Sequence, residues 1–121
     1  MNNTIFVFGS NLAGRHGKGA ALYAKQVQGA KQEIGVGRSG NSYAIPTKDE
    51  KLRVLSISEI RKYIGEFCQY ATESPLETFV LTPIGTGLAG IPKRTIAGLF
   101  KHQKLPSNVY LTSTWIYEDA A

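Results

Sequence analysis

The segment that most constrains the fold lies near the N-terminus, where an apolar run meets a glycine-rich basic loop and then an alanine-rich stretch. It reads FVFGSNLAGRHGKGAA over residues 6–21. The β-branched and aromatic residues of Thr4–Phe8 predict a strand buried on both faces. Residues 9–17 are then a loop, and residues 18–28 predict a helix that stops at Gly29. Such a junction is typical of α/β proteins and suits an anion, because the unpaired N–H groups of a helix collect there.

The remainder of the chain repeats this alternation of strand and helix. Ser56 and Glu59 form a capping-box pattern, and apolar residues then recur at helical spacing to about Glu73. The other expected elements are strands over Ser42–Pro46, Phe79–Leu81 and Asn108–Thr114, a surface loop over Thr47–Arg53, and a helix over Lys93–His102 with Pro92 in its first turn. The order predicts a three-layer α/β/α sandwich with a mostly parallel central sheet. Its length of 121 residues favours a single domain, residues 1–121.

Charge and composition narrow the class of partner. The chain carries a net charge of +5, which suits an anionic ligand, but its basic residues are spread along the sequence. A nucleic-acid site usually needs a basic stripe, so this distribution disfavours nucleic acid. The single cysteine, Cys68, allows no intrachain disulfide and fits a reducing, cytoplasmic setting. We expect no membrane partner, no metal and no cofactor, because long apolar runs, a signal-peptide pattern and a second cysteine are missing from the sequence.

Three glycine-rich loops are the candidate functional segments. Residues 9–17 and 83–90 each follow a strand, and the carboxyl ends of parallel strands meet at one edge of a sheet. We therefore expect these two loops to form the walls of one cleft. Residues 35–40 precede a strand and should start at the opposite edge, where they either reach over to the cleft or have a structural role.

Two of these loops resemble a known family. VFGSN at residues 7–11, followed by GKGAA at residues 17–21, resembles the macro-domain signature in which a strand ends at an asparagine and a glycine-rich turn opens a helix. PIGTGLAGIP at residues 83–92 resembles the second macro-domain loop, which wraps a diphosphate. Together they are similar to the compact macro domains of small phage-encoded proteins.

This resemblance implies a ligand, ADP-ribose or a related NAD-derived nucleotide. It places Asn11 at the distal ribose and the loop of residues 85–88 at the phosphates. The ligand-binding residues expected from it are Gly9, Ser10, Asn11, Gly17, Lys18, Gly19, Ala20, Ile84, Gly85, Thr86, Gly87 and Leu88. Macro domains usually carry a Gly-Asp-Ile motif whose Asp reads the adenine amine, and the printed sequence has none, so the base that is recognised stays open.

Several of these residues also have simpler interpretations. Asn11 could bond its own turn, and Thr86 could shape a tight turn instead of binding phosphate. Cys68 lies on an apolar helix face and reads as a small buried side chain. Trp115 and Tyr117 read as core or rim residues, with stacking on an adenine as the alternative.

Other functions remain open at this stage. A hydrolase of ADP-ribosyl linkages or of ADP-ribose 1″-phosphate would need a general base, for which Asn11, His16 and Asp49 are candidates. Against this, a loop histidine is often a bystander, and Asp49 reads more simply as a solvated carboxylate, with Lys48 as its partner or a phosphate ligand. The further alternatives are a nucleic-acid-binding or interaction module, and a binder that sequesters an NAD-derived defence signal of a phage host.

Overall fold

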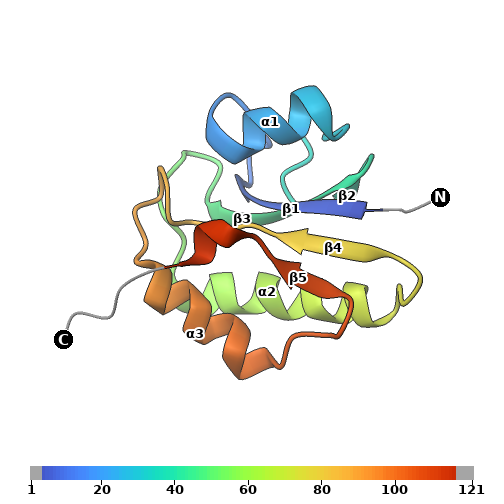
Figure 1. The fold of residues 1–121 in the computed structure, drawn as a ribbon. Coiled ribbons are helices and arrows are strands. Elements are labelled where there is room, and N and C mark those ends of the chain that lie inside the picture. Colours follow the sequence, from blue (N-terminus) through green and yellow to red (C-terminus); the bar gives the residue numbers. More distant parts are fainter. Residues whose placement is uncertain (1–3, 117–121) are drawn as a thin grey trace.

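A five-stranded sheet forms the centre of the protein, in a computed structural model that describes residues 4–116 (Figure 1). The strand order is β2-β3-β1-β4-β5. The strands are β1 (Thr4–Asn11), β2 (Gly37–Ser39), β3 (Ser42–Lys48), β4 (Thr78–Leu81) and β5 (Val109–Leu111). The helices are α1 (Gly19–Val27), α2 (Ile57–Thr72), α3 (Lys93–Gln103) and the short 3-10 helix η1 (Ser113–Trp115). β1 pairs in parallel with β3 and β4, and β4 with β5, while β2 is antiparallel to β3.

Helices cover both faces of the sheet, as Figure 1 shows, so the predicted three-layer α/β sandwich is confirmed. Alternate residues of β1 divide between two cores. Ile5 and Val7 join the larger core with α2 and α3, whereas Phe8 packs with Ala21 and Ala24 of α1. The central run of β1, residues 5–8, is therefore apolar because both faces of the strand are covered.

The capping box predicted for α2 is present. The Ser56 hydroxyl accepts a hydrogen bond from the Glu59 backbone N–H at 3.2 Å, and the Glu59 carboxylate accepts one from the Ser56 N–H at 3.3 Å. The predicted apolar face of this helix is buried from Ile60 onward and includes Cys68, whereas its first apolar residue, Ile57, is exposed. Across residues 4–116, no helix combines the length and apolarity that crossing a membrane would need.

Several element boundaries differ from the prediction. β1 extends to Asn11. Pro46 does not end β3, because a proline removes only one hydrogen-bond donor from the strand, and pairing with β1 resumes at Lys48. Pro92 is the N-cap of α3 and not part of its first turn. The expected last strand is shorter, since η1 follows β5 after Thr112.

The third glycine-rich loop begins at the carboxyl edge of β1 and runs through β2 to Gly40 at the opposite edge, so its expected start at that opposite edge is wrong. The sequence reading missed β2, whose antiparallel pairing with β3 brings the chain in from the carboxyl edge. Gly35 packs against Asn11 so closely that a Cβ at Gly35 would overlap the Asn11 carbonyl oxygen. The Ser10 hydroxyl also donates to the Gly35 carbonyl. The start of this loop thus packs against the carboxyl end of β1.

Candidate functional site

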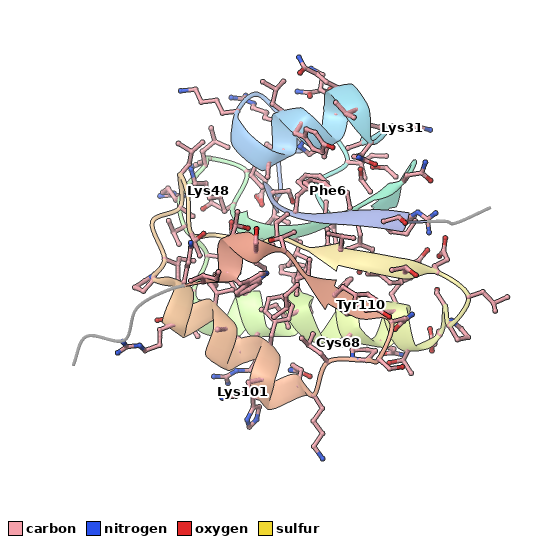
Figure 2. All side chains as sticks on the ribbon, in the orientation of Figure 1. Phe6, Lys31, Lys48, Cys68, Lys101 and Tyr110 are labelled. Atoms are coloured by element: carbon pink, nitrogen blue, oxygen red, sulfur yellow. The ribbon has the colours of Figure 1, made fainter. Side chains whose placement is uncertain are left out.

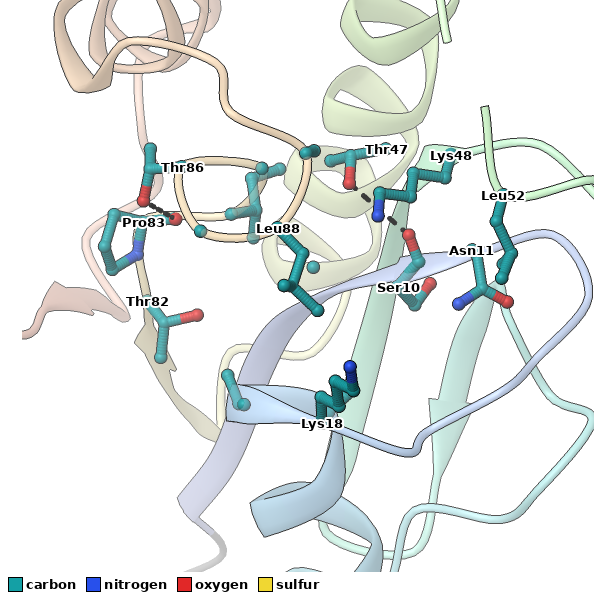
Figure 3. A pocket seen from close by; sticks show the side chains of 18 of the residues that line it. Ser10, Asn11, Lys18, Thr47, Lys48, Leu52, Thr82, Pro83, Thr86 and Leu88 are labelled. Atoms are coloured by element: carbon teal, nitrogen blue, oxygen red, sulfur yellow. Dashed lines mark hydrogen bonds between the residues drawn. The ribbon is translucent and has the colours of Figure 1, made fainter. Parts of the chain in front are cut away.

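A pocket of about 930 Å³ lies at the carboxyl edge of the sheet, between the loops that follow β1, β3 and β4 (Figure 3). The first and third of these are the two loops expected to share a cleft, and they do line one pocket. All twelve residues predicted to bind ligand are among its lining residues: Gly9, Ser10, Asn11, Gly17, Lys18, Gly19, Ala20, Ile84, Gly85, Thr86, Gly87 and Leu88.

The first wall is the N-terminus of α1. Lys18 is its N-cap, but no side chain caps the helix and its first turn contains no acidic residue. The backbone N–H groups of Gly19, Ala20 and Ala21 make no hydrogen bond within residues 4–116, while the residues themselves line the pocket. Three donors and the positive end of a helix dipole therefore face the pocket.

The second wall is the loop after β4. Its chain reverses tightly, since Gly85 has a φ of +73° and Ile91 N–H donates to the Gly85 carbonyl at 2.8 Å. The Thr86 hydroxyl donates to the Pro83 carbonyl at 2.7 Å, which is the tight-turn role. In the described part of the chain, the N–H groups of Gly85, Gly87 and Leu88 have no acceptor. They are the donors that a bound anion could use on this side.

The second wall packs closely against β1. A Cβ at Gly9 would lie 3.0 Å from the Gly85 nitrogen and 3.3 Å from Ile84, so the backbone of β1 and that of the loop after β4 are in close contact at Gly9. A side chain at residue 9 would therefore require the neighbouring backbone to move by a few tenths of an ångström, which glycine avoids.

The electrostatics of the pocket favour an anion. Arg15, Lys18 and Lys48 line it, and none of its lining residues within 4–116 is a carboxylate. In Figure 3 the side chains of Lys18 and Lys48 extend from opposite sides toward the space between the loops. Lys48 was expected either to pair with Asp49 or to contact a phosphate, and the ion pair that Asp49 forms is with Arg53.

Asn11 lines the pocket and also shapes the loop that follows it. Its side-chain oxygen accepts a hydrogen bond from the Arg15 N–H, and its amide donates to the Arg15 carbonyl, both at 2.9 Å. The local turn role is therefore real. One N–H and one lone pair of the amide remain for a ligand. The pairing of β1 with β3 shifts register between Ser10 and Asn11, where Thr47 is the extra residue on β3.

His16 lies outside the pocket lining. Its side chain is fully buried, with Nε2 3.0 Å from the Ile34 carbonyl oxygen and the ring edge-on to Phe8. Nδ1 has no hydrogen-bond partner within residues 4–116. The loop of residues 12–18 folds this ring toward the α1 side of the sheet, so its geometry suits packing and not proton transfer in the pocket.

Asp49 is also absent from the pocket lining. Its carboxylate accepts hydrogen bonds from the N–H groups of Lys51 at 2.8 Å and Arg53 at 2.9 Å, and it lies 3.4 Å from the Arg53 guanidinium. These bonds, led by the one from Arg53, lower the pKa of Asp49. The carboxylate thus organises its own loop.

Some lining residues were not predicted. Thr47 was assigned to a surface loop, yet it is a buried residue of β3. The other lining residues outside the predicted set are Arg15, Ala21, Lys48, Leu52, Thr82, Pro83, Ala89 and Thr114, of which Ala21, Pro83 and Ala89 are next to predicted positions. Leu52 and Thr114 carry no sequence signal, because they reach the pocket through the path of distant loops.

Trp115 belongs to the core and not to the pocket. Its indole N–H donates to the Leu81 carbonyl at 2.7 Å, and its ring is edge-on to Phe100. Tyr117, the other candidate for stacking on a base, lies outside the described residues. Within residues 4–116, no three His, Cys, Asp or Glu side chains gather as metal ligands would.

Comparison with known proteins identifies the fold. No family model matches the sequence, and no curated protein sequence matches it. Among solved structures, the chain is similar to DarTG of Thermosipho africanus, solved in complex with ADP-ribose, with a TM-score of 0.62 and 18% sequence identity. The chain has a macro-domain-like fold. The similarity covers 93% of this chain and 38% of that one, so this protein spans well under half the length of its structural neighbour.

Proposed function

We propose that this protein binds ADP-ribose or a related NAD-derived nucleotide, with the diphosphate held between α1 and the loop after β4. The observation that carries the proposal is the pair of facing walls, each with three backbone N–H groups that have no acceptor in the described chain. A diphosphate has enough oxygen acceptors for both walls, and the three cations of the lining offset its charge. The structural neighbour was solved with ADP-ribose, which supports the same class of ligand.

Binding is proposed here in preference to hydrolysis. Of the three residues considered for catalysis, Asn11 lines the pocket, while His16 and Asp49 do not. An amide neither takes up nor releases a proton near neutral pH, so Asn11 is suited to orient a ribose hydroxyl.

Titration calorimetry with ADP-ribose, cyclic ADP-ribose, NAD and AMP tests the proposal. We expect ADP-ribose to bind more tightly than AMP, because AMP offers one phosphate to two walls. Failure of wild-type protein to bind any of these ligands at millimolar concentration would refute the proposal.

Two charge-matched variants locate the site. Lys48→Gln removes a cation of the lining, and Lys101→Gln removes one near the C-terminus of α3, which does not line the pocket and is well separated from Lys48 in Figure 2. With a phosphate charge of about −2 at about 6 Å in water, losing one cation costs about 1.4 kcal/mol, or about tenfold in affinity. Lys101→Gln should leave affinity unchanged, and equal losses in the two variants would mean that only overall charge matters.

A further inference from the structure

The loop after β3 is a short hairpin whose tip is held by Asp49. Lys48 and Val54 pair across its base, and Asp49 N–H donates to the Arg53 carbonyl at 2.7 Å. The Asp49 carboxylate then accepts the N–H groups of Lys51 and Arg53 from inside the turn. Hydrogen bonds from two backbone N–H groups to the Asp49 side chain thus hold the tip in place.

This hairpin presents Leu52 to the pocket. Leu52 has a φ of +62°, a conformation that costs a leucine energy, and its N–H donates to the Asp49 carbonyl at 3.1 Å. Its side chain lines the pocket although 41% of the residue is exposed. In Figure 3 Leu52 and Asn11 are drawn at the same end of the pocket, away from Thr86, and both line it. This end of the pocket therefore combines a polar amide with an apolar side chain that is held in an unfavourable backbone conformation.

A ribose matches this pair of side chains. One edge of the sugar carries hydroxyl groups, which suit the free N–H and lone pair of Asn11, and its C–H face is apolar. We propose that Leu52 is a specificity-determining residue that packs on the C–H face of the ligand's terminal ribose, and that Asp49 is the positioning residue that holds it there. This inference rests on the proposed function and adds the part of the ligand that the hairpin recognises.

The test compares ADP-ribose with ADP, which has the same diphosphate and adenosine but lacks the terminal ribose. Leu52→Ala should weaken ADP-ribose binding by about fivefold to tenfold, the value for uncovering one small apolar contact, and should leave ADP affinity within about twofold of wild type. Leu52→Gly should give the same loss for ADP-ribose without a lower melting temperature, because glycine adopts a φ of +62° without strain. Leu76→Ala, at a leucine that is 97% exposed, is the matched control and should change neither affinity.

Two Asp49 variants test the positioning role. Asp49→Ala should reproduce the selective loss of ADP-ribose affinity, whereas Asp49→Asn should restore it, because the amide oxygen can still accept the two N–H groups. A residue needed only for folding would change the affinities for ADP-ribose and ADP together.

The possible failures are distinguishable. If wild-type protein binds ADP-ribose and Leu52→Ala binds it equally well, the inference is wrong and the proposed function stands. Equal losses for ADP-ribose and ADP in Leu52→Ala would also refute it, because Leu52 would then contact the part that the ligands share. If wild-type protein binds no ADP-ribose at all, both proposals fail.

Discussion

Lys18 offers a test in which stability and affinity should change in opposite directions. It is the N-cap of α1, in the extended conformation that a capping residue adopts, with φ −148° and ψ 159°, yet its side chain caps nothing. Replacing it with Asn or Asp supplies an acceptor for the unpaired N–H groups, which stabilises a helix by about 1 kcal/mol. Asp adds a favourable interaction of about 0.3–1 kcal/mol with the helix dipole. We therefore expect melting temperatures several degrees above wild type, since about 1 kcal/mol corresponds to roughly 3–6 °C at this size.

The same substitutions should weaken binding of ADP-ribose. Lys18→Asn removes one positive charge, and Lys18→Asp changes the charge by two units. Against a phosphate charge of about −2 at about 6 Å in water, the losses are about 1.4 and 2.8 kcal/mol, or about tenfold and a hundredfold in affinity. The measurements are thermal unfolding without ligand and calorimetric titration with ADP-ribose at low salt. A more stable Lys18→Asp variant that binds ADP-ribose as tightly as wild type would refute the placement of the diphosphate at α1.

Three further outcomes are expected. His16→Ala should lower the free energy of unfolding by about 2–4 kcal/mol in urea titrations, because it removes a fully buried ring; a loss below about 0.5 kcal/mol would contradict the packing role. Gly35→Ala should destabilise the fold by more than about 2 kcal/mol, since its Cβ would overlap the Asn11 carbonyl. The control Gly98→Ala, in open space on α3, should stabilise the fold by up to about 1 kcal/mol. Equal effects of the two substitutions would refute the contact between Gly35 and Asn11. Burial raises the pKa of Cys68 from 9.0 to about 11, so between these pH values the unfolded chain ionises first and stability falls by at most about 3 kcal/mol. Cys68→Ala should flatten that decline in alkaline unfolding curves, and an unchanged slope would count against the shift.

Local patterns were sufficient to predict most of the fold. The continuous apolar run of β1 and the capping box of α2 each depend on neighbouring residues in the sequence, and both are present in the structure. β2 could not be found in this way, because its three residues, Gly37–Ser39, have no strand pattern of their own. Its position depends on tertiary contacts: it pairs with the open edge of β3, and Arg38 bonds to Glu77 at 2.8 Å and to Tyr70 at 3.0 Å.

The candidate site was predictable to a similar degree. The two loops were identified because glycine spacing is a sequence property, and the parallel order of the strands implied a shared edge. The positions of His16 and Leu52 were not predictable, since each depends on how a loop folds back over the sheet. The Asp49 loop carried one usable signal, because an aspartate just after a strand often accepts N–H groups from the residues that follow it.

The strand order explains why three loops of different character converge on one pocket. β1 lies between β3 and β4, and all three run in parallel, so the segments that follow them leave the same edge side by side. The connection after β1 includes α1 on one face of the sheet, and the connection after β3 includes α2 on the other face. The connections on the two sides of β1 therefore cross opposite faces of the sheet. Open α/β sheets bind ligands at such a point. The same strand order determines where each binding group lies. The segments with free N–H donors follow the adjacent strands β1 and β4, which suits a diphosphate between them. The hairpin with Leu52 follows β3, on the other side of β1 from β4. A substitution at the hairpin tip, residues 49–53, should therefore affect recognition of the ribose, and one at Lys48, in α1 or in the loop after β4 should affect every ligand that carries the diphosphate.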